Sequence, residues 1–282
     1  MRVLIAGCGD LGTETGLRLA AAGHSVVGIR RNPTRLPAPL IGVRGDLAAG
    51  HLDELPDDVE VVIYSAAADE RTETAYLGAY VDGPRHVLDA LARVRARPRR
   101  LLLVSSTAVY GITDGSWVDE DTPARPATVT GEILLEAEMA VLERGPDPGA
   151  VRLSGIYGPG RTRLVDQLRA GRAVAPDPPV YANRIHRDDA AAALTHLATR
   201  REPPQPCYLG VDDAPVDRGE VLRFLADELG LPEPPTGPDR RTRGGNKRCR
   251  NDRLMATGFT LTYPTYREGY RAMLAGGGVR HP

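Results

Sequence analysis

A glycine-rich loop near the N-terminus constrains the fold of this chain more than any other feature. The apolar run Arg2–Ala6 leads directly into residues 7–12, which read GCGDLG, and a helical pattern follows. In this strand–turn–helix context Gly7 allows a tight turn, Gly9 lets backbone approach a pyrophosphate, and Gly12 lets the helix pack closely. The N-terminal end of the helix then faces the phosphates. The pattern predicts a dinucleotide-binding unit, and a purely structural glycine turn is the alternative.

Apolar runs and helical patterns alternate over the first two-thirds of the chain. This order is typical of an α/β fold, a doubly wound parallel Rossmann sheet with helices on both faces. Strands buried on both faces read as continuous apolar runs, and we expect them at Arg2–Ala6, Ser25–Ile29, Gly42–Arg44, Val59–Ser65, Arg100–Ser105, Ala150–Ser154 and Cys207–Gly210. Helical patterns cover Leu11–Ala22, Thr74–Ala96, Gly131–Arg144, Arg187–Arg200 and Gly219–Leu229.

Two segments rich in Pro, Gly and Arg interrupt and follow this alternation. We expect residues 1–160 and 183–212 to form the dinucleotide-binding Rossmann domain. Residues 161–182 and 213–282 are expected to form a small C-terminal cap on the substrate side.

Composition excludes several classes of protein. The 282 residues are 41% hydrophobic and 26% charged with a net charge of −1, which is ordinary globular composition and gives no reason to expect a nucleic-acid partner. No apolar run approaches the roughly 20 residues that a membrane span needs, and the N-terminus reads as a strand, not a secretory signal. Cys8, Cys207 and Cys249 are scattered, without disulfide or zinc spacing. We expect a cytoplasmic chain with no metal and no membrane partner.

The end of the second strand distinguishes the two nicotinamide dinucleotides. An NAD(H) site usually has Asp or Glu there, to accept hydrogen bonds from the ribose hydroxyls. This chain has Arg30 and Arg31 instead, and two guanidiniums suit a 2′-phosphate. The sequence therefore predicts NADP(H), with NAD(H) as the alternative cofactor. The alternative for the two arginines themselves is that they are solvated side chains without a ligand. Asp46, after the third strand, is expected to contact the adenine amino group.

Five further motifs occur in an order that resembles a known family. Residues 45–46 (GD), 65–67 (SAA), 105–111 (SSTAVYG), 155–161 (GIYGPGR) and 185–189 (IHRDD) are similar to motifs of the extended, atypical short-chain dehydrogenase/reductases, the NAD-dependent epimerase/dehydratase family. The resemblance covers nearly the whole chain. It implies an NAD(P)-dependent oxidoreductase or epimerase-like enzyme that acts on a small polar substrate, such as a sugar nucleotide or similar metabolite.

The resemblance and the glycine loop together yield a set of expected contacts. The cofactor is expected to touch Gly7, Gly9, Asp10, Leu11, Gly12, Arg30, Arg31, Asp46, Leu47, Ala66 and Ala67. Substrate contacts are expected at Thr107, Tyr110, Thr130, Tyr157 and Lys247. Ser106 lies four residues before Tyr110, as the catalytic Ser or Thr of the family does.

One departure from the family pattern bears on mechanism. The family's Tyr-x-x-x-Lys pair aligns with Thr130 and Leu134, which cannot shuttle protons near neutral pH, and Lys247 is the chain's only lysine. The chain therefore resembles a bacterial subgroup that lacks the pair.

Ser106 and His186 are the candidates to replace this pair. Ser106 would hydrogen-bond a substrate oxygen, and His186 titrates near neutrality. The alternative to a catalytic role is capping of backbone groups for Ser106 and structural hydrogen bonding for His186. Tyr110 and Tyr157 are alternative phenols, and Glu132 reads as a helix cap.

Three functions remain open at this stage. The first is NADP(H)-dependent redox chemistry on a small molecule, including transient oxidation as in epimerases. The second is a redox-neutral isomerase, dehydratase or cyclase on the same scaffold. The third is a non-catalytic NADP(H)-binding sensor or partner protein. A homodimer is compatible with each of them.

Overall fold

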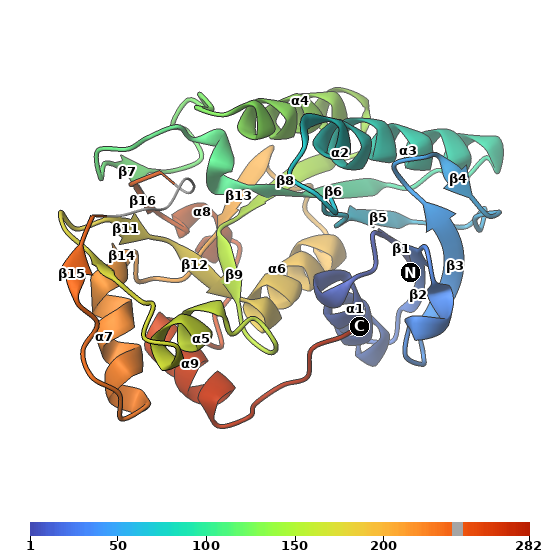
Figure 1. The fold of residues 1–282 in the computed structure, drawn as a ribbon. Helices are drawn as coiled ribbons and strands as arrows, with labels where there is room; N and C mark the ends of the chain where they lie inside the picture. Colours follow the sequence, from blue (N-terminus) through green and yellow to red (C-terminus); the bar gives the residue numbers. More distant parts are fainter. Residues whose placement is uncertain (239–244) are drawn as a thin grey trace.

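The computed structural model describes residues 1–238 and 245–282 around one large central sheet (Figure 1). Its eight strands lie in the order β13-β8-β6-β5-β1-β2-β3-β4, and every neighbouring pair is parallel except β3–β4. The strands are β1 (Arg2–Ala6), β2 (Ser25–Arg30), β3 (Ile41–Asp46), β4 (His51–Leu52), β5 (Val61–Tyr64), β6 (Arg100–Ser106), β8 (Pro148–Leu153) and β13 (Cys207–Gly210). The predicted α/β fold class is confirmed, and only the short edge strand β4 lacked a prediction.

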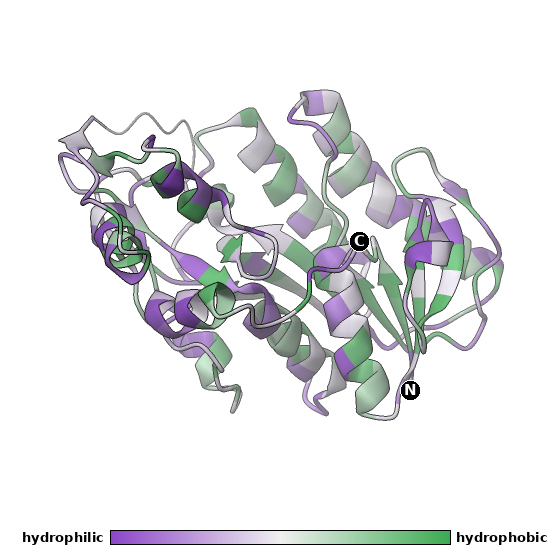
Figure 2. Cartoon of the chain, turned by 60° about the horizontal axis from the view of Figure 1, so that its bottom comes forward, coloured by the Kyte–Doolittle hydropathy of each residue, from purple (hydrophilic) through white to green (hydrophobic). Residues whose placement is uncertain are grey.

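Helices cover both faces of this sheet, as a parallel sheet requires. They are α1 (Asp10–Ala21) and α6 (Arg187–Thr199) on one face, with α3 (Gly83–Arg93) and α4 (Val129–Arg144) on the other. Side chains alternate between the faces: Val61 and Ile63 of β5 pack toward α1 and α6, whereas Val62 and Tyr64 pack toward α3 and α4. In Figure 2 the central strands are accordingly hydrophobic, between helices with mixed surfaces.

The helix predicted over residues 74–96 is divided into three parts. It consists of α2 (Glu73–Tyr76), a π-helical segment over Leu77–Asp82, and α3. The Thr72 hydroxyl caps its start by accepting a hydrogen bond from the Ala75 N–H at 3.2 Å. π-Helical turns are rare in proteins, but those that occur are often found at functional sites.

A second apolar cluster lies away from the sheet, among α5 (Arg163–Arg169), α7 (Arg218–Glu228) and α9 (Tyr266–Leu274). The short strands around it are β9 (Gly155–Tyr157), β10 (Ala175–Pro176), β11 (Tyr181–Ala182), β12 (Arg184–His186), β14 (Val216–Asp217) and β15 (Thr236–Gly237). Strands β7 (Trp117–Val118) and β16 (Arg248–Cys249) pair with one another and belong to a different apolar cluster, with Tyr110 and Leu134. Helices α5, α7 and α9 come from the predicted cap, and residues 239–244 of that cap lie outside the described residues.

Two pieces of the predicted cap segment 213–282 pack elsewhere. Leu254 of α8 (Asp252–Met255) and Phe259 belong to the apolar cluster beneath the sheet, with α1 and α6. The last residues run back to α1, where the His281 N–H donates to Asp10 (Figure 1). In the described part of the chain, no helix is long and apolar enough to cross a bilayer.

Candidate cofactor and active site

A cleft of about 680 Å³ opens where the central strands end. Its walls come from the residues that follow the carboxyl ends of β1, β2, β3, β5, β6 and β8. In open α/β sheets this is the edge where ligands bind. All eleven predicted cofactor residues line this one cleft, and Ser106 lines it with them.

The glycine loop has the geometry that a diphosphate requires. Gly7 has φ +84°, and an added Cβ there would lie 2.4 Å from the Ala66 backbone. A Cβ on Gly12 would come within 2.9 Å of the Ser65 hydroxyl, so this glycine permits close packing. At Gly9 an added Cβ meets nothing within 4 Å, because the position borders open space. These residues fit the diphosphate of a dinucleotide at the start of α1.

Both arginines at the carboxyl end of β2 already have partners. The Arg31 guanidinium makes a two-bond ion pair with Asp69, at 2.6 and 2.8 Å, and both side chains are about two-thirds exposed. The Asp69 carboxylate raises the pKa of Arg31. The Arg30 Nη1 donates to the backbone carbonyl of Pro282 at 3.0 Å. The carboxylate of Asp46 accepts a hydrogen bond from the Ala49 N–H at 3.1 Å.

Ser106 ends strand β6 and begins a short 3₁₀ turn over Thr107–Val109. Its Oγ accepts a hydrogen bond from the Ala108 N–H at 3.2 Å, so the residue caps this turn. Capping uses an oxygen lone pair and leaves the hydroxyl proton available to donate into the cleft. The capping and substrate-binding readings of Ser106 are therefore compatible.

Beside Ser106 lies a buried ion pair. Arg152 of β8 donates to the Glu138 carboxylate of α4, with Nη2 2.7 Å from Oε2 and Nε 3.1 Å from both oxygens. The two side chains are 8% and 1% exposed. The Ser105 hydroxyl donates to Glu138, and Arg152 Nη1 donates to the Tyr110 hydroxyl. Tyr110 in turn donates to the Asp119 carbonyl at 2.9 Å.

The other predicted catalytic and substrate residues are absent from the lining of the cleft that the described residues form. Among the described residues that line the cleft, none is Tyr110, Tyr157, His186 or Lys247. Tyr110 and Tyr157 are 2% and 4% exposed, and burial raises the pKa of both phenols. The Lys247 amine is buried and donates to the Tyr110 carbonyl at 3.0 Å, and burial lowers its pKa.

His186 occupies a structural position. It is 2% exposed, and its Nδ1 accepts a hydrogen bond from the Asp188 N–H at 3.2 Å, which caps α6. Burial lowers the pKa of the imidazole, which favours the neutral, accepting form. The geometry therefore supports structural hydrogen bonding, the alternative reading of this histidine.

Thr107 and Thr130 also lie outside the lining of the cleft that the described residues form. Thr107 is 7% exposed. The Thr130 hydroxyl lies 3.3 Å from that of Thr128, the residue that caps α4. The helix itself reads VTGEILLEAEMAVLER, with neither tyrosine nor lysine.

Asp69, Tyr80 and Arg161 are among the residues of the cleft that the sequence analysis did not assign. Tyr80 comes from the π-helical segment, and burial raises the pKa of its phenol to about 12. No sequence pattern signals a π turn. The sequence offered a signal for Arg161, because this residue ends the GIYGPGR motif. Its contact with Asp10 had no such signal, because the two residues are 151 positions apart.

The chain can now be compared with known proteins. Residues 3–206 match the NAD-dependent epimerase/dehydratase family. The chain belongs to this family. Its fold, its oxidoreductase class and its NAD(P)-type cofactor are thus those that the sequence predicted.

Relatives and solved structures agree with this assignment. A dTDP-6-deoxy-L-talose 4-dehydrogenase (NAD(P)(+)) from Kitasatospora kifunensis is 29% identical over 81% of this chain and 79% of that enzyme. A candidate NAD-dependent epimerase/dehydratase from Methylobacillus flagellatus is 34% identical, with a TM-score of 0.78 and 98% of each chain covered. MoeE5, solved with UDP-glucose and NAD, is 25% identical, with a TM-score of 0.80 and 98% of each chain covered.

Proposed function

We propose that this protein is an NADP(H)-dependent oxidoreductase or epimerase-like enzyme for a small polar substrate, a sugar nucleotide or similar metabolite. One observation carries the proposal: a single cleft joins the glycine loop, the two arginines at the carboxyl end of β2 and the Ser106 hydroxyl. The names of the relatives support the substrate class, since one acts on a dTDP-deoxysugar and another binds UDP-glucose.

The preference for NADP(H) rests on Arg30 and Arg31. The pair between Arg31 and Asp69 is exposed, and such pairs contribute only about 0–1 kcal/mol. A 2′-phosphate carries more charge than one carboxylate and accepts several charge-assisted hydrogen bonds, each worth about 1.5–3 kcal/mol. The phosphate therefore competes effectively for Arg31. Arg30 exchanges a single main-chain oxygen, that of Pro282, for the same phosphate.

The chemical step on this proposal avoids a Tyr-Lys pair. A nicotinamide bound in this cleft would supply or accept the hydride. The Ser106 hydroxyl, fixed by its cap at the end of β6, donates a hydrogen bond to the substrate oxygen. Tyr80 lines the same cleft, and burial raises its pKa to about 12, so its phenol stays protonated at neutral pH and can donate a hydrogen bond. The net proton is then taken from solvent when the substrate is reduced and released to solvent when it is oxidised.

Cofactor titration tests the first half of the proposal. NADPH and NADH are titrated by fluorescence against the wild type and against the double variant Arg30→Ala, Arg31→Ala. We expect tighter binding of NADPH, and a loss of roughly tenfold to over a hundredfold in the variant. Equal affinities for the two cofactors, or no loss in the variant, would refute the preference.

Turnover tests the second half. dTDP-6-deoxy-L-talose, named in the Kitasatospora relative, is the first substrate to assay, with NADP⁺ reduction followed by absorbance. Ser106→Ala should lower kcat by about 10- to 1,000-fold with NADP(H) affinity unchanged. Thr130→Val is the matched control and should change the rate little. A collapse in the control, or none in Ser106→Ala, contradicts the assignment.

The burial of Tyr110 and Tyr157 favours a second candidate, a non-catalytic NADP(H) sensor or partner protein. Cofactor binding without turnover across a panel of dTDP- and UDP-sugars supports this candidate. Substrate conversion with no net change in NADPH absorbance indicates a redox-neutral isomerase, dehydratase or cyclase. A steady change in absorbance supports the oxidoreductase.

A further inference from the structure

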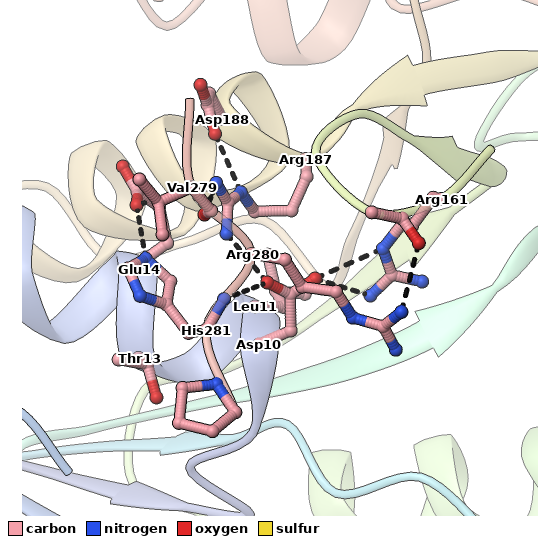
Figure 3. Close-up of polar contacts among 12 residues, drawn as sticks. Asp10, Leu11, Thr13, Glu14, Arg161, Arg187, Asp188, Val279, Arg280 and His281 are labelled. Atoms are coloured by element: carbon pink, nitrogen blue, oxygen red, sulfur yellow. Dashed lines mark hydrogen bonds and ion pairs between the residues drawn. The ribbon is translucent and has the colours of Figure 1, made fainter. Parts of the chain in front are cut away.

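Arg161 joins two parts of the chain at the glycine loop. It follows β9, and its side chain reaches the first residue of α1, where Nε and Nη2 donate to Asp10 Oδ2 at 3.2 and 3.0 Å (Figure 3). About one-third of the side chain is exposed. Arg161 lines the cleft together with Gly9 and Leu11. This arginine therefore stands beside the backbone that the cofactor diphosphate approaches.

Arg161 offsets a repulsion between two negative charges at the start of α1. The first residue of this helix, Asp10, carries a carboxylate in the place where a diphosphate must bind. A helix N-terminus attracts both anions, but the two anions repel one another. Without a cation beside it, Asp10 would weaken the binding of any dinucleotide.

The other guanidiniums near Asp10 also pair with further carboxylates, so the net charge beside the phosphate site depends on Arg161. Arg187 Nη1 donates to Asp10 Oδ1 at 2.7 Å, but Arg187 is 1% exposed and also pairs with Asp188 at 2.6 Å. Arg18 pairs with Glu14 at 2.9 Å. The cluster thus holds three carboxylates and three guanidiniums: Asp10, Glu14 and Asp188 against Arg18, Arg161 and Arg187. Without Arg161 its formal charge changes from zero to −1, at the edge of the phosphate site.

The loop that carries Arg161 is held in place before any ligand binds. Arg280 Nη1 donates to the Gly160 carbonyl at 2.9 Å, and the Arg161 N–H donates to the Gly158 carbonyl at 2.9 Å. The C-terminal residues that supply Arg280 are themselves fixed, since Arg187 Nη2 donates to the Val279 carbonyl at 2.8 Å (Figure 3). A group ordered in advance loses little entropy when it binds.

We propose that Arg161 binds the diphosphate of the cofactor and that Asp10 is its positioning residue. The proposal rests on the proposed NADP(H) function. Nε and Nη2 of Arg161 hold Asp10, so Nη1 is the nitrogen that reaches a phosphate oxygen. The acidic residue in the glycine loop then orients a cation, and the repulsion between Asp10 and the diphosphate is offset.

Calorimetric titration with two probes tests the assignment. NADP⁺ carries the diphosphate, whereas adenosine 2′-monophosphate has the same adenosine and 2′-phosphate without it. Arg161→Gln should weaken NADP⁺ binding by at least about tenfold, the loss of one charge-assisted hydrogen bond, and leave adenosine 2′-monophosphate within about twofold. Arg161→Lys, which keeps the charge, should lose less. Arg163→Gln is the matched control: it is an exposed arginine two residues further along, at the start of α5, and its affinities should stay at wild-type values.

The outcomes separate this assignment from the proposed function. Wild-type NADP⁺ affinity in a folded Arg161→Gln overturns the role of Arg161 alone. An equal loss for both probes, or the same loss in Arg163→Gln, also overturns it, because the effect is then not at the diphosphate. If the wild type binds neither probe, the NADP(H) function itself fails.

Discussion

Replacing Arg152 by methionine would remove the cation from the buried pair beside Ser106. Methionine fills a similar volume with an unbranched chain. The Glu138 carboxylate, 1% exposed, would then keep only the Ser105 hydroxyl as a donor. The three contacts from Arg152, at 2.7 and 3.1 Å, would be lost together.

The expected cost follows from what remains. Breaking a buried ion pair by removing one partner typically costs about 3–5 kcal/mol, because the other charge stays buried and uncompensated. Replacing both partners by apolar residues is often nearly neutral. Arg152→Met should therefore lower the free energy of unfolding by about 3–5 kcal/mol at neutral pH. The double variant Arg152→Met, Glu138→Leu should recover most of that loss.

Urea unfolding of the wild type and both variants measures these free energies.

Two results would refute this reasoning. A loss below about 1 kcal/mol would mean that Glu138 finds another partner or is solvated when Arg152 is absent. A double variant no more stable than the single one would mean that packing, not charge, is what Arg152 contributes. NADPH affinity of the folded variants should stay near the wild-type value, since neither side chain lines the cleft.

Three further predictions concern single residues. Burial raises the pKa of Asp212 to about 7, above the value in the unfolded chain. The free energy of unfolding should therefore fall by up to about 4 kcal/mol through this group as pH rises from about 4 to 7. Urea unfolding of Asp212→Asn should lack that decline, and an unchanged pH profile would contradict the assignment. His186→Gln should lower stability by about 1 kcal/mol, as loss of a cap does, and leave kcat unchanged. The lowered pKa of His186 means that it costs stability as pH falls below about 6.5, so the variant should tolerate acid better. A collapse of kcat would make it catalytic after all. Gly9→Val should fold, because φ is −86° and an added Cβ meets no atom, yet it should abolish NADPH fluorescence enhancement by filling the diphosphate space. Normal enhancement would place the site elsewhere.

Predictions from the sequence succeeded where the evidence is local. The strands are buried on both faces, so they read as continuous apolar runs, and their predicted bounds differ from the observed ones by at most two residues. The residues predicted to contact the cofactor lie at or just after strand ends, and parallel strands bring their carboxyl ends to one edge. The eleven contacts predicted from separate parts of the chain therefore meet in one cleft.

Predictions for side chains beyond those strand ends depended on distant partners. Tyr110 lies only four residues after Ser106, yet its hydroxyl turns to Arg152 and the Asp119 carbonyl, away from the cleft. His186 was expected near the substrate, but in the packed structure its Nδ1 accepts a hydrogen bond from a backbone N–H at the start of α6. Neither direction can be read from residue type, because each depends on which buried donor or acceptor lies within reach.

By itself, the sequence determined the doubly wound sheet, the glycine loop and the cationic residues at the carboxyl end of β2, because each depends on neighbours within a few residues. Only the tertiary structure decided how the acidic loop residue Asp10 is neutralised. Its partners Arg161, Arg187 and the His281 N–H lie 151, 177 and 271 residues away in the chain. Charge pairing over such separations follows from how the chain packs. The same glycine loop would carry an unpaired carboxylate in any fold that did not return these segments to the start of α1.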